Sequence, residues 1–347
     1  MTPFATVAKL IIQIPCYNEE GHLAETLAAL PRAVPGFDVV ETLIIDDGSG
    51  DDTAGVARRA GATYLLRFPV HLGLAQAFSA GLDTALKLGA DVIVNTDADN
   101  QYRGADVARL VRPILAGQAE MVIGDRAPRR LQRFGPMKRL LQGWGSWMVR
   151  QLSGTSVPDA ASGFRAFSRR AALRLNVFTK FTYTIETIIQ AGKKHIAIAH
   201  VPIETNPDSR PSRLFGRLST YLKHSIATLV RIYALYEPLK VFVWLGSVAV
   251  AAGVLIMLRF LIYYMMGTSR GLIQSLILAA VLTIVGFQTM LIGLVADLIG
   301  GLRSLAEDTL FRVRELELRL GAGPDVVRLA GAAEEPAMEC VEGHAGR

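Results

Sequence analysis

The sequence predicts an α/β domain with a mostly parallel sheet, followed by a pair of membrane-spanning helices. In the first two-thirds of the 347 residues, short β-rich runs alternate with helical patterns. That order is typical of a parallel sheet covered on both faces. Acidic and glycine-rich turns follow several of the expected strands. Two long uncharged stretches come later, and hydrophobic residues make up 51% of the chain, which is high for a purely soluble protein.

The first domain is expected to run from residue 1 to residue 209. Its buried strands are predicted at Leu10–Ile14, Val39–Ile45, Thr63–Leu66, Asp91–Asn95 and Met121–Ile123. The intervening helices are predicted at Gly21–Leu30, Thr53–Ala60 and Leu74–Leu88. Ligands of open α/β sheets bind at the carboxyl ends of strands, so the functional site is expected in the turns that follow them.

Residues 210–238 form a basic and apolar segment with helical spacing. Arginine and lysine alternate there with leucine, isoleucine and tyrosine. Such a pattern predicts juxtamembrane helices lying on a membrane surface. An ordinary amphipathic helix on a soluble core is the alternative.

Two apolar stretches follow in tandem. Val241–Leu258 and Leu272–Ala296 contain no charged residue, and each is long enough for a hydrocarbon core that needs ~20 apolar residues. We expect transmembrane helices at 239–266 and 271–299; two buried core helices are the weaker alternative. Basic residues before the first span and after the second predict that the first domain and both termini are cytoplasmic. The expected location is a bacterial or archaeal plasma membrane.

The remaining segment, 300–347, is predicted to be a cytoplasmic helix followed by a disordered tail from Gly321. The N-terminus has no signal-peptide pattern. The two cysteines, Cys16 and Cys340, are far apart, which fits a reducing compartment.

Three expected strands end in polar turns with recognisable residues. The first turn contains Pro15-Cys16-Tyr17-Asn18-Glu19, the second Asp46-Asp47-Gly48-Ser49, and the fourth Asp97-Ala98-Asp99-Asn100-Gln101. In this order they resemble the family-2 inverting glycosyltransferases, which have the glycosyltransferase-A fold. The resemblance implies that the donor nucleotide is held by Pro15, Tyr17, Asn18, Glu19, Asp46 and Asp47, and that the turn with Asp97 and Ala98 holds a metal and the donor diphosphate.

The chemistry of the third turn supports a metal site. Two carboxylates one residue apart repel a diphosphate, but they can bind it through Mg²⁺ or Mn²⁺, which neutralises it as a leaving group. Asp97 and Asp99 fit this role, and Gln101 offers a further oxygen ligand. A solvated turn or helix cap is the alternative for a lone Asp-x-Asp. One of Asp46 and Asp47 is expected to accept hydrogen bonds from the base or ribose. Helix capping by Asp47 or Ser49 is the alternative, and the two roles are compatible.

Later segments match the same family pattern. Gly124-Asp125-Arg126 resembles a strand end whose arginine pairs with donor phosphates, and the segment Asp159–Phe167, with Ser162, resembles an acceptor-side loop. Glu186 stands where relatives carry an acidic residue near the acceptor; it is either a general base or a partner of basic residues at the membrane surface. Arg210, Ser212 and Arg213 resemble a phosphate-binding stretch, with an anchor to anionic lipids as the alternative.

Together the motifs and the hairpin resemble the dolichyl-phosphate mannosyltransferase and undecaprenyl-phosphate glycosyltransferase group. The resemblance implies inverting, metal-dependent transfer of a hexose from a donor of the GDP-mannose or UDP-glucose type to a polyprenyl phosphate. Transfer to a hydroxyl of another lipid or glycan is the first alternative, and a non-catalytic membrane scaffold the second. A nucleic-acid partner is not expected, and the sequence leaves a homo-oligomer open.

Overall fold

The computed structural model describes residues 8–126, 150, 153–155, 157–177, 183–206, 237–267, 273–321, 323 and 326–329. Their strands form one eight-stranded sheet of order β7-β5-β6-β4-β1-β2-β3-β8. The strands are β1 (Lys9–Cys16), β2 (Val39–Asp46), β3 (Tyr64–Arg67), β4 (Val92–Asn95), β5 (Met121–Asp125), β6 (Arg165–Ser168), β7 (Ile198–Pro202) and β8 (Val327–Arg328). The pairs β1–β2, β1–β4, β2–β3 and β5–β7 are parallel, whereas β6 is antiparallel to both of its neighbours and β8 to β3.

The core has two layers, one on each face of the sheet, because successive side chains of the central strands point to opposite faces. In β1, Ile11 faces one layer while Leu10 and Ile12 face the other. The first layer is covered by α3 (Leu74–Lys87), α6 (Arg169–Arg174) and α7 (Tyr183–Lys193). The second is covered by α1 (Leu23–Ala29), α2 (Thr53–Arg59) and α4 (Val107–Leu115), the last following the short helix η1 (Gly104–Asp106). The predicted mostly parallel α/β sheet is therefore confirmed.

The five predicted strands are all present, but β6, β7 and β8 were not predicted. β6 is four residues long, and β7 is only partly buried along its length, so neither has the continuous apolar run by which the central strands were found. β6 is important for the site, because its antiparallel direction brings the start of the strand to the edge where β1, β2, β4 and β5 end.

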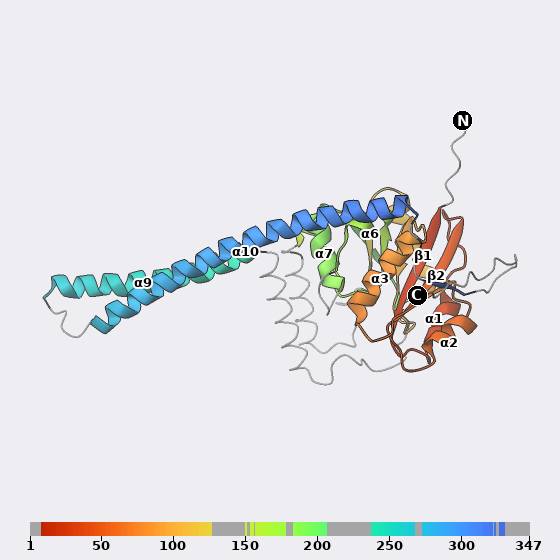
Figure 1. Cartoon of the computed structure of the whole chain (residues 1–347), viewed down its shortest axis with the longest axis horizontal. Coiled ribbons are helices and arrows are strands. Elements are labelled where there is room, and N and C mark those ends of the chain that lie inside the picture. The colour runs from red at the N-terminus through yellow and green to blue at the C-terminus, as the bar shows by residue number, and fades with distance from the viewer. Residues whose placement is uncertain are drawn as a thin grey trace, which may run out of the picture.

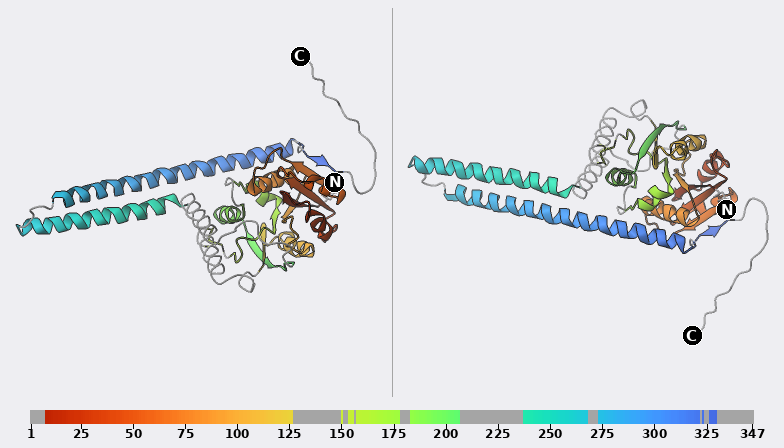
Figure 2. Two further views of the ribbon diagram at one scale, coloured as in Figure 1. Left: turned by 90° about the horizontal axis from the view of Figure 1, so that it is seen from below. Right: turned by 90° about the horizontal axis from the view of Figure 1, so that it is seen from above.

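Two long helices leave the domain together. α9 (Pro238–Met265) and α10 (Ile273–Arg319) pack against each other and extend away from the sheet as a narrow hairpin (Figures 1 and 2). Glycines permit the close approach: a Cβ on Gly246 would lie 2.5 Å from the carbonyl oxygen of Gly286, and one on Gly253 would lie 2.5 Å from Thr283 Oγ1. Both helices are long and apolar enough to cross a membrane, and an 18-residue stretch of each has a mean hydropathy of 2.5 in α9 and 2.2 in α10.

The C-terminal part differs from the prediction in two ways. α10 continues without a break from the apolar run to Arg319, so the expected boundary between a span and a separate cytoplasmic helix is absent. Its last turns pack on the domain, where Phe311 and Leu318 contact the first core layer. The expected tail also contains order, because Val327 and Arg328 pair with β3 as β8. Backbone pairing with an exposed sheet edge needs no strong sequence signal. Most of the predicted juxtamembrane segment, 210–236 of 210–238, lies outside the residues that the structure describes.

Candidate active site

The strand ends bring the predicted polar turns to one edge of the sheet. The parallel strands β1, β2, β4 and β5 end there, and the antiparallel β6 begins there. As a result the turn after β4, which contains Asp97 and Asp99, lies beside the loop that leads into β6. Asn95, the last residue of β4, ties the two together, since its amide nitrogen donates to the carbonyl oxygen of Gly163 at 2.9 Å.

Asp97 lies in a tight and polar setting. A Cβ on Gly163 would come within 2.8 Å of Asp97 Oδ1, so only glycine lets this loop approach the carboxylate so closely. The Tyr102 hydroxyl donates to Asp97 and accepts the N–H of Gly163 at 3.1 Å. Burial, and then the negative charge of Asp99, raise the pKa of Asp97 to about 6. A divalent cation would favour the ionised form of this buried carboxylate by offsetting the negative charge of its neighbour.

The residues present fit a divalent cation bound jointly with a ligand. Asp99 is anchored by the backbone N–H of Gln101, which donates to Asp99 Oδ1 at 3.2 Å. Asn100 takes the left-handed conformation, with φ 55°, and so turns the chain between them. Among the described residues there is no group of three His, Cys, Asp or Glu side chains that could hold a metal. Asp97, Asp99 and Gln101 could therefore supply only part of an oxygen shell, the remainder coming from a diphosphate and water.

Arg126 follows β5 and points its guanidinium toward the same region. Its Nε and Nη2 donate to the two oxygens of Asp159 at 2.8 and 3.1 Å, a bidentate pair. The positive charge of Arg126 lowers the pKa of Asp97, against the larger effect of burial. The structure therefore places Arg126 beside the carboxylate pair, already held by a buried acid. Its predicted contact with donor phosphates stays a prediction.

Asp46 and Asp47, predicted to hold the base or ribose, have protein partners at the end of β2. Asp47 is 2% exposed, and its two oxygens accept the backbone N–H groups of Leu72 at 2.7 Å and Gly73 at 2.8 Å. Asp47 therefore holds the loop that leads into α3, which begins at Leu74. Asp46 accepts the N–H of Ser49 at 3.0 Å and lies 3.1 Å from Arg67 Nε.

The turn after β1 exposes an aromatic surface. The ring of Tyr17, 42% exposed, stacks on His71 with centroids 3.9 Å apart. Asp47 holds His71 through Nδ1 at 2.9 Å. Pro15 is buried within β1, and Glu19, also largely buried, donates its backbone N–H to Thr53 Oγ1 at 2.9 Å.

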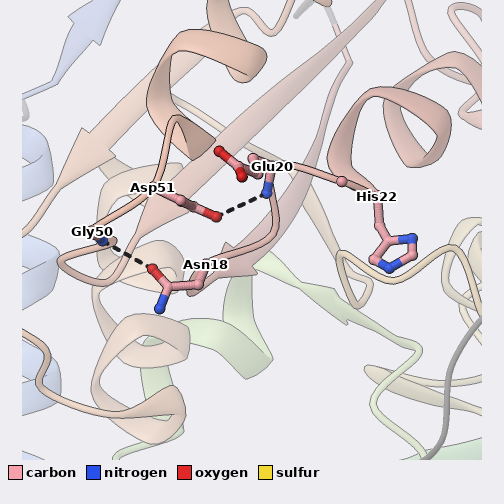
Figure 3. Close-up of a pocket in the computed structure, with 6 residues that line it drawn as sticks. Asn18, Glu20, His22, Gly50 and Asp51 are labelled. Atoms are coloured by element: carbon pink, nitrogen blue, oxygen red, sulfur yellow. Dashed lines mark hydrogen bonds between the residues drawn. The ribbon is translucent and has the colours of Figure 1, made fainter.

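A surface hollow lies next to this turn, lined by Asn18, Glu20, Gly21, His22, Gly50 and Asp51. Figure 3 shows the Asn18 amide oxygen accepting the N–H of Gly50 at 2.9 Å, and Asp51 accepting that of Glu20 at 3.2 Å. The imidazole of His22 points away from the other side chains. The hollow includes Asn18 but not Asp97, Asp99 or Arg126.

Two of the predicted acceptor-side residues are buried, and the other three are not described by the structure. Ser162 is fully buried, with its hydroxyl inside the loop, so the structure does not present it to a ligand. Glu186 is 1% exposed and lies 3.7 Å from Arg303 of α10. Arg210, Ser212 and Arg213 lie outside the described residues.

Several site residues were not predicted from the sequence. Arg165 is fully buried, where its guanidinium donates to the carbonyl oxygens of Ser162, Ala160 and Thr184 and to Thr187 Oγ1. It thereby fixes the loop before β6 to α7. Desolvation lowers its pKa to about 10. The sequence did contain a signal for this role, since Arg165 stands between Phe164 and Phe167 in an apolar segment. A charged side chain in an apolar segment is buried only when it has polar partners. Tyr102 and His71 carried no comparable signal.

Comparisons with known proteins agree with this geometry. The family model for glycosyl transferase family 2 matches residues 11–175, which include every strand end described above. The UDP-N-acetylglucosamine–dolichyl-phosphate N-acetylglucosaminyltransferase of Methanococcus voltae is 29% identical, over 55% of this chain and 83% of its own length. The polyprenol monophosphomannose synthase of Mycolicibacterium smegmatis is 28% identical, over 56% of this chain and 76% of its own.

A solved structure supports the fold. Glucosyl-3-phosphoglycerate synthase from Mycobacterium tuberculosis, crystallised with UDP, superposes with a TM-score of 0.52 at 24% identity, covering 65% of this chain and 79% of its own. A complex of the same enzyme with Mn²⁺, UDP-glucose and phosphoglyceric acid gives a TM-score of 0.50. The fold, the order of the strand-end motifs and the family match lead to one conclusion: the chain is a glycosyltransferase and belongs to glycosyl transferase family 2.

Proposed function

We propose that this protein transfers a hexose from a nucleotide sugar to a polyprenyl phosphate at the cytoplasmic face of a membrane, with inversion at the anomeric carbon. The observation that carries the proposal is the Asp97–Asp99 pair at the carboxyl edge of a sheet whose domain contacts an apolar helical hairpin. The two relatives described above are named for transfer or synthesis on dolichyl phosphate and polyprenol.

The donor would lie along the strand ends. Tyr17 and the hollow beside Asn18 would receive the nucleotide, and the diphosphate would extend toward Asp97 and Asp99. Mg²⁺ or Mn²⁺ held by Asp97, Asp99 and Gln101 supplies charge neutralisation for the departing diphosphate. Arg126, fixed by Asp159, adds a positive charge that is already oriented and needs no rearrangement during the reaction.

The acceptor chemistry is simple if the acceptor is a phosphate. A phosphate monoester has a second pKa near ~6 and is already anionic at neutral pH. Its oxygen forms the new bond to the anomeric carbon as the bond to the nucleoside diphosphate breaks. No proton has to be removed, so positioning of the two reactants is the main task of the protein.

The test is a transfer assay with purified protein in detergent. Labelled GDP-mannose and UDP-glucose are offered with Mn²⁺ and either a polyprenyl phosphate or the corresponding polyprenol. Transfer to the phosphate alone supports the proposal. Equal transfer to the alcohol would show a hydroxyl acceptor, and no transfer or donor hydrolysis with any nucleotide sugar would favour a scaffold.

A further inference from the structure

Glu186 lies at the junction between the catalytic domain and the hairpin. Its carboxylate, 1% exposed, is 3.7 Å from Arg303 Nη2 and 3.4 Å from the amide nitrogen of Gln190. Gln190 belongs to α7, but Arg303 belongs to α10 and lies two turns beyond the uncharged run that ends at Ala296. A carboxylate removed from water needs such a partner, because desolvation otherwise makes its charge costly.

The pair is part of a longer network of charges. Arg303 Nε also donates to Glu307 Oε1 at 2.9 Å, and Glu307 Oε2 lies 2.8 Å from the ammonium of Lys194, directly after α7. The neighbouring Lys193 lies 3.0 Å from Glu237, the residue that precedes α9. The two consecutive lysines at the end of α7 therefore contact the domain-side parts of both hairpin helices.

The opposite end of α7 is attached to the active site. The hydroxyl of Tyr183, its first residue, accepts from Asn95 at 3.0 Å at the end of β4. The buried Arg165 donates to Thr184 and Thr187 in the first turns of the same helix. The first turn of α7 is thus fixed both to the loop beside Asp97 and, through Glu186, to α10, while the lysines at its other end hold the hairpin a second time.

We propose that Glu186 is a positioning residue: paired with Arg303, it sets the orientation of the catalytic edge relative to the bilayer that the hairpin crosses. This inference rests on the proposed function, since it assumes a lipid acceptor at the membrane surface. α10 is one continuous helix from its apolar run to Arg319, and an error of about 1 Å in the relative placement of reactants can reduce a rate ~100-fold. The charge network should therefore affect the rate of transfer to an acceptor held in the bilayer much more than the rate of transfer to an acceptor free in solution.

The central variant is Arg303→Gln, with Glu315→Gln as the matched control. Glu315 lies on the same helix in an exposed pair with Arg319. In vesicles, Arg303→Gln should lower kcat/KM for a long-chain polyprenyl phosphate by about 10- to 100-fold. Transfer to a short-chain, water-soluble isoprenyl phosphate should keep most of its rate, whereas Glu315→Gln should affect neither.

Glu186→Gln separates positioning from general-base catalysis. A positioning role predicts that it shifts the ratio of long-chain to short-chain activity as Arg303→Gln does, with the pH profile of kcat/KM unchanged in shape. The double variant should lose less than the product of the single losses, because it leaves no unpaired buried charge. Lys194→Gln, at the accessible end of the network, should act in the same direction and serves if the central variants fail to fold.

Three results would overturn the inference. The first is an equal loss on both acceptors in Arg303→Gln. The second is the disappearance of a pH limb in Glu186→Gln, which would make Glu186 a base. The third is a double variant whose loss of activity equals the product of the losses in Glu186→Gln and Arg303→Gln. If the wild type instead glycosylates neither lipid phosphate, the proposed function itself has failed, and this outcome is distinct from the other three.

Discussion

At the scale of single residues, the carboxylate pair after β4 carries the most consequential prediction. Asp99→Ala should lower transfer by roughly 10³-fold or more, and Asp97→Ala nearly as much, because neutralisation of a leaving diphosphate by a bound cation contributes several kcal/mol. EDTA should inactivate the wild type, and Mn²⁺ or Mg²⁺ should restore it. Initial rates with a labelled donor are the measurement. Full activity in EDTA would remove the metal from the mechanism.

Asp97 also predicts a pH dependence. Its pKa is raised to about 6, chiefly by burial and then by Asp99, so its carboxyl binds a proton as the pH falls through about 6. Because a proton and a cation compete for the same oxygen, the Mn²⁺ concentration needed for half-maximal transfer should rise below that pH. Titrating Mn²⁺ at about pH 5 and about pH 7 tests this. An unchanged requirement would show that Asp97 does not bind the ion.

Substitution of Asp47 can distinguish a structural role of this residue from a role in donor binding. In Asp47→Asn one oxygen becomes an NH₂ group that cannot accept the N–H of Leu72 or Gly73, so the free energy of unfolding should fall by about 1–3 kcal/mol. Thermal unfolding in detergent measures this loss. Asp52→Asn, which alters an exposed pair with Arg59, is the control and should have little effect. A variant that binds donor poorly but unfolds like the wild type would instead favour ribose or base recognition by Asp47.

At the scale of elements, local sequence pattern predicted the central strands, since β1 and β4 are continuous apolar runs. It also located the site, because strand ends in a parallel sheet meet at one edge. It could not predict which partners meet there. Asp47 binds the backbone 25 residues later, and Arg126 binds Asp159, 33 residues away. No local periodicity encodes such pairs. The pairing of Glu186 with Arg303 could not be predicted either, because it requires α10 to fold back onto the domain.

The hairpin carries a prediction of its own. Gly253 faces Thr283 and Ala279 so closely that any larger side chain must separate α9 from α10. Gly253→Val should destabilise the helix pair by about 1–3 kcal/mol, measured as a lower unfolding temperature in detergent. Ala251→Val, at an exposed position on the same helix, introduces the same side chain without that contact. Equal stability of the two variants would show that the glycine contact is unimportant.

At the scale of the whole molecule, the helices and the catalytic domain suggest a single orientation. α9 begins beside Lys193, and the polar end of α10 returns to the same domain through Glu307 and Arg314. Both polar ends of the hairpin are therefore on the side of the catalytic domain, while the last turns of α9 and the first turns of α10 lie far from it (Figure 2). Large apolar side chains along both helices are exposed, and such a surface is unfavourable in water.

This arrangement predicts that the hairpin turn is outside the cell and everything else inside. α9 has 28 residues, which at about 1.5 Å per residue is ~42 Å, enough for a hydrocarbon core of ~30 Å. The arginines in the polar end of α10 favour a cytoplasmic location. With Cys340→Ser to remove the tail thiol and Cys16 buried, Ser269→Cys should react with a membrane-impermeant maleimide on intact cells. A cysteine at the exposed Glu315 should react only after permeabilisation. The reverse pattern would invert the topology, and labelling of both positions only after permeabilisation would mean that the hairpin does not cross the membrane.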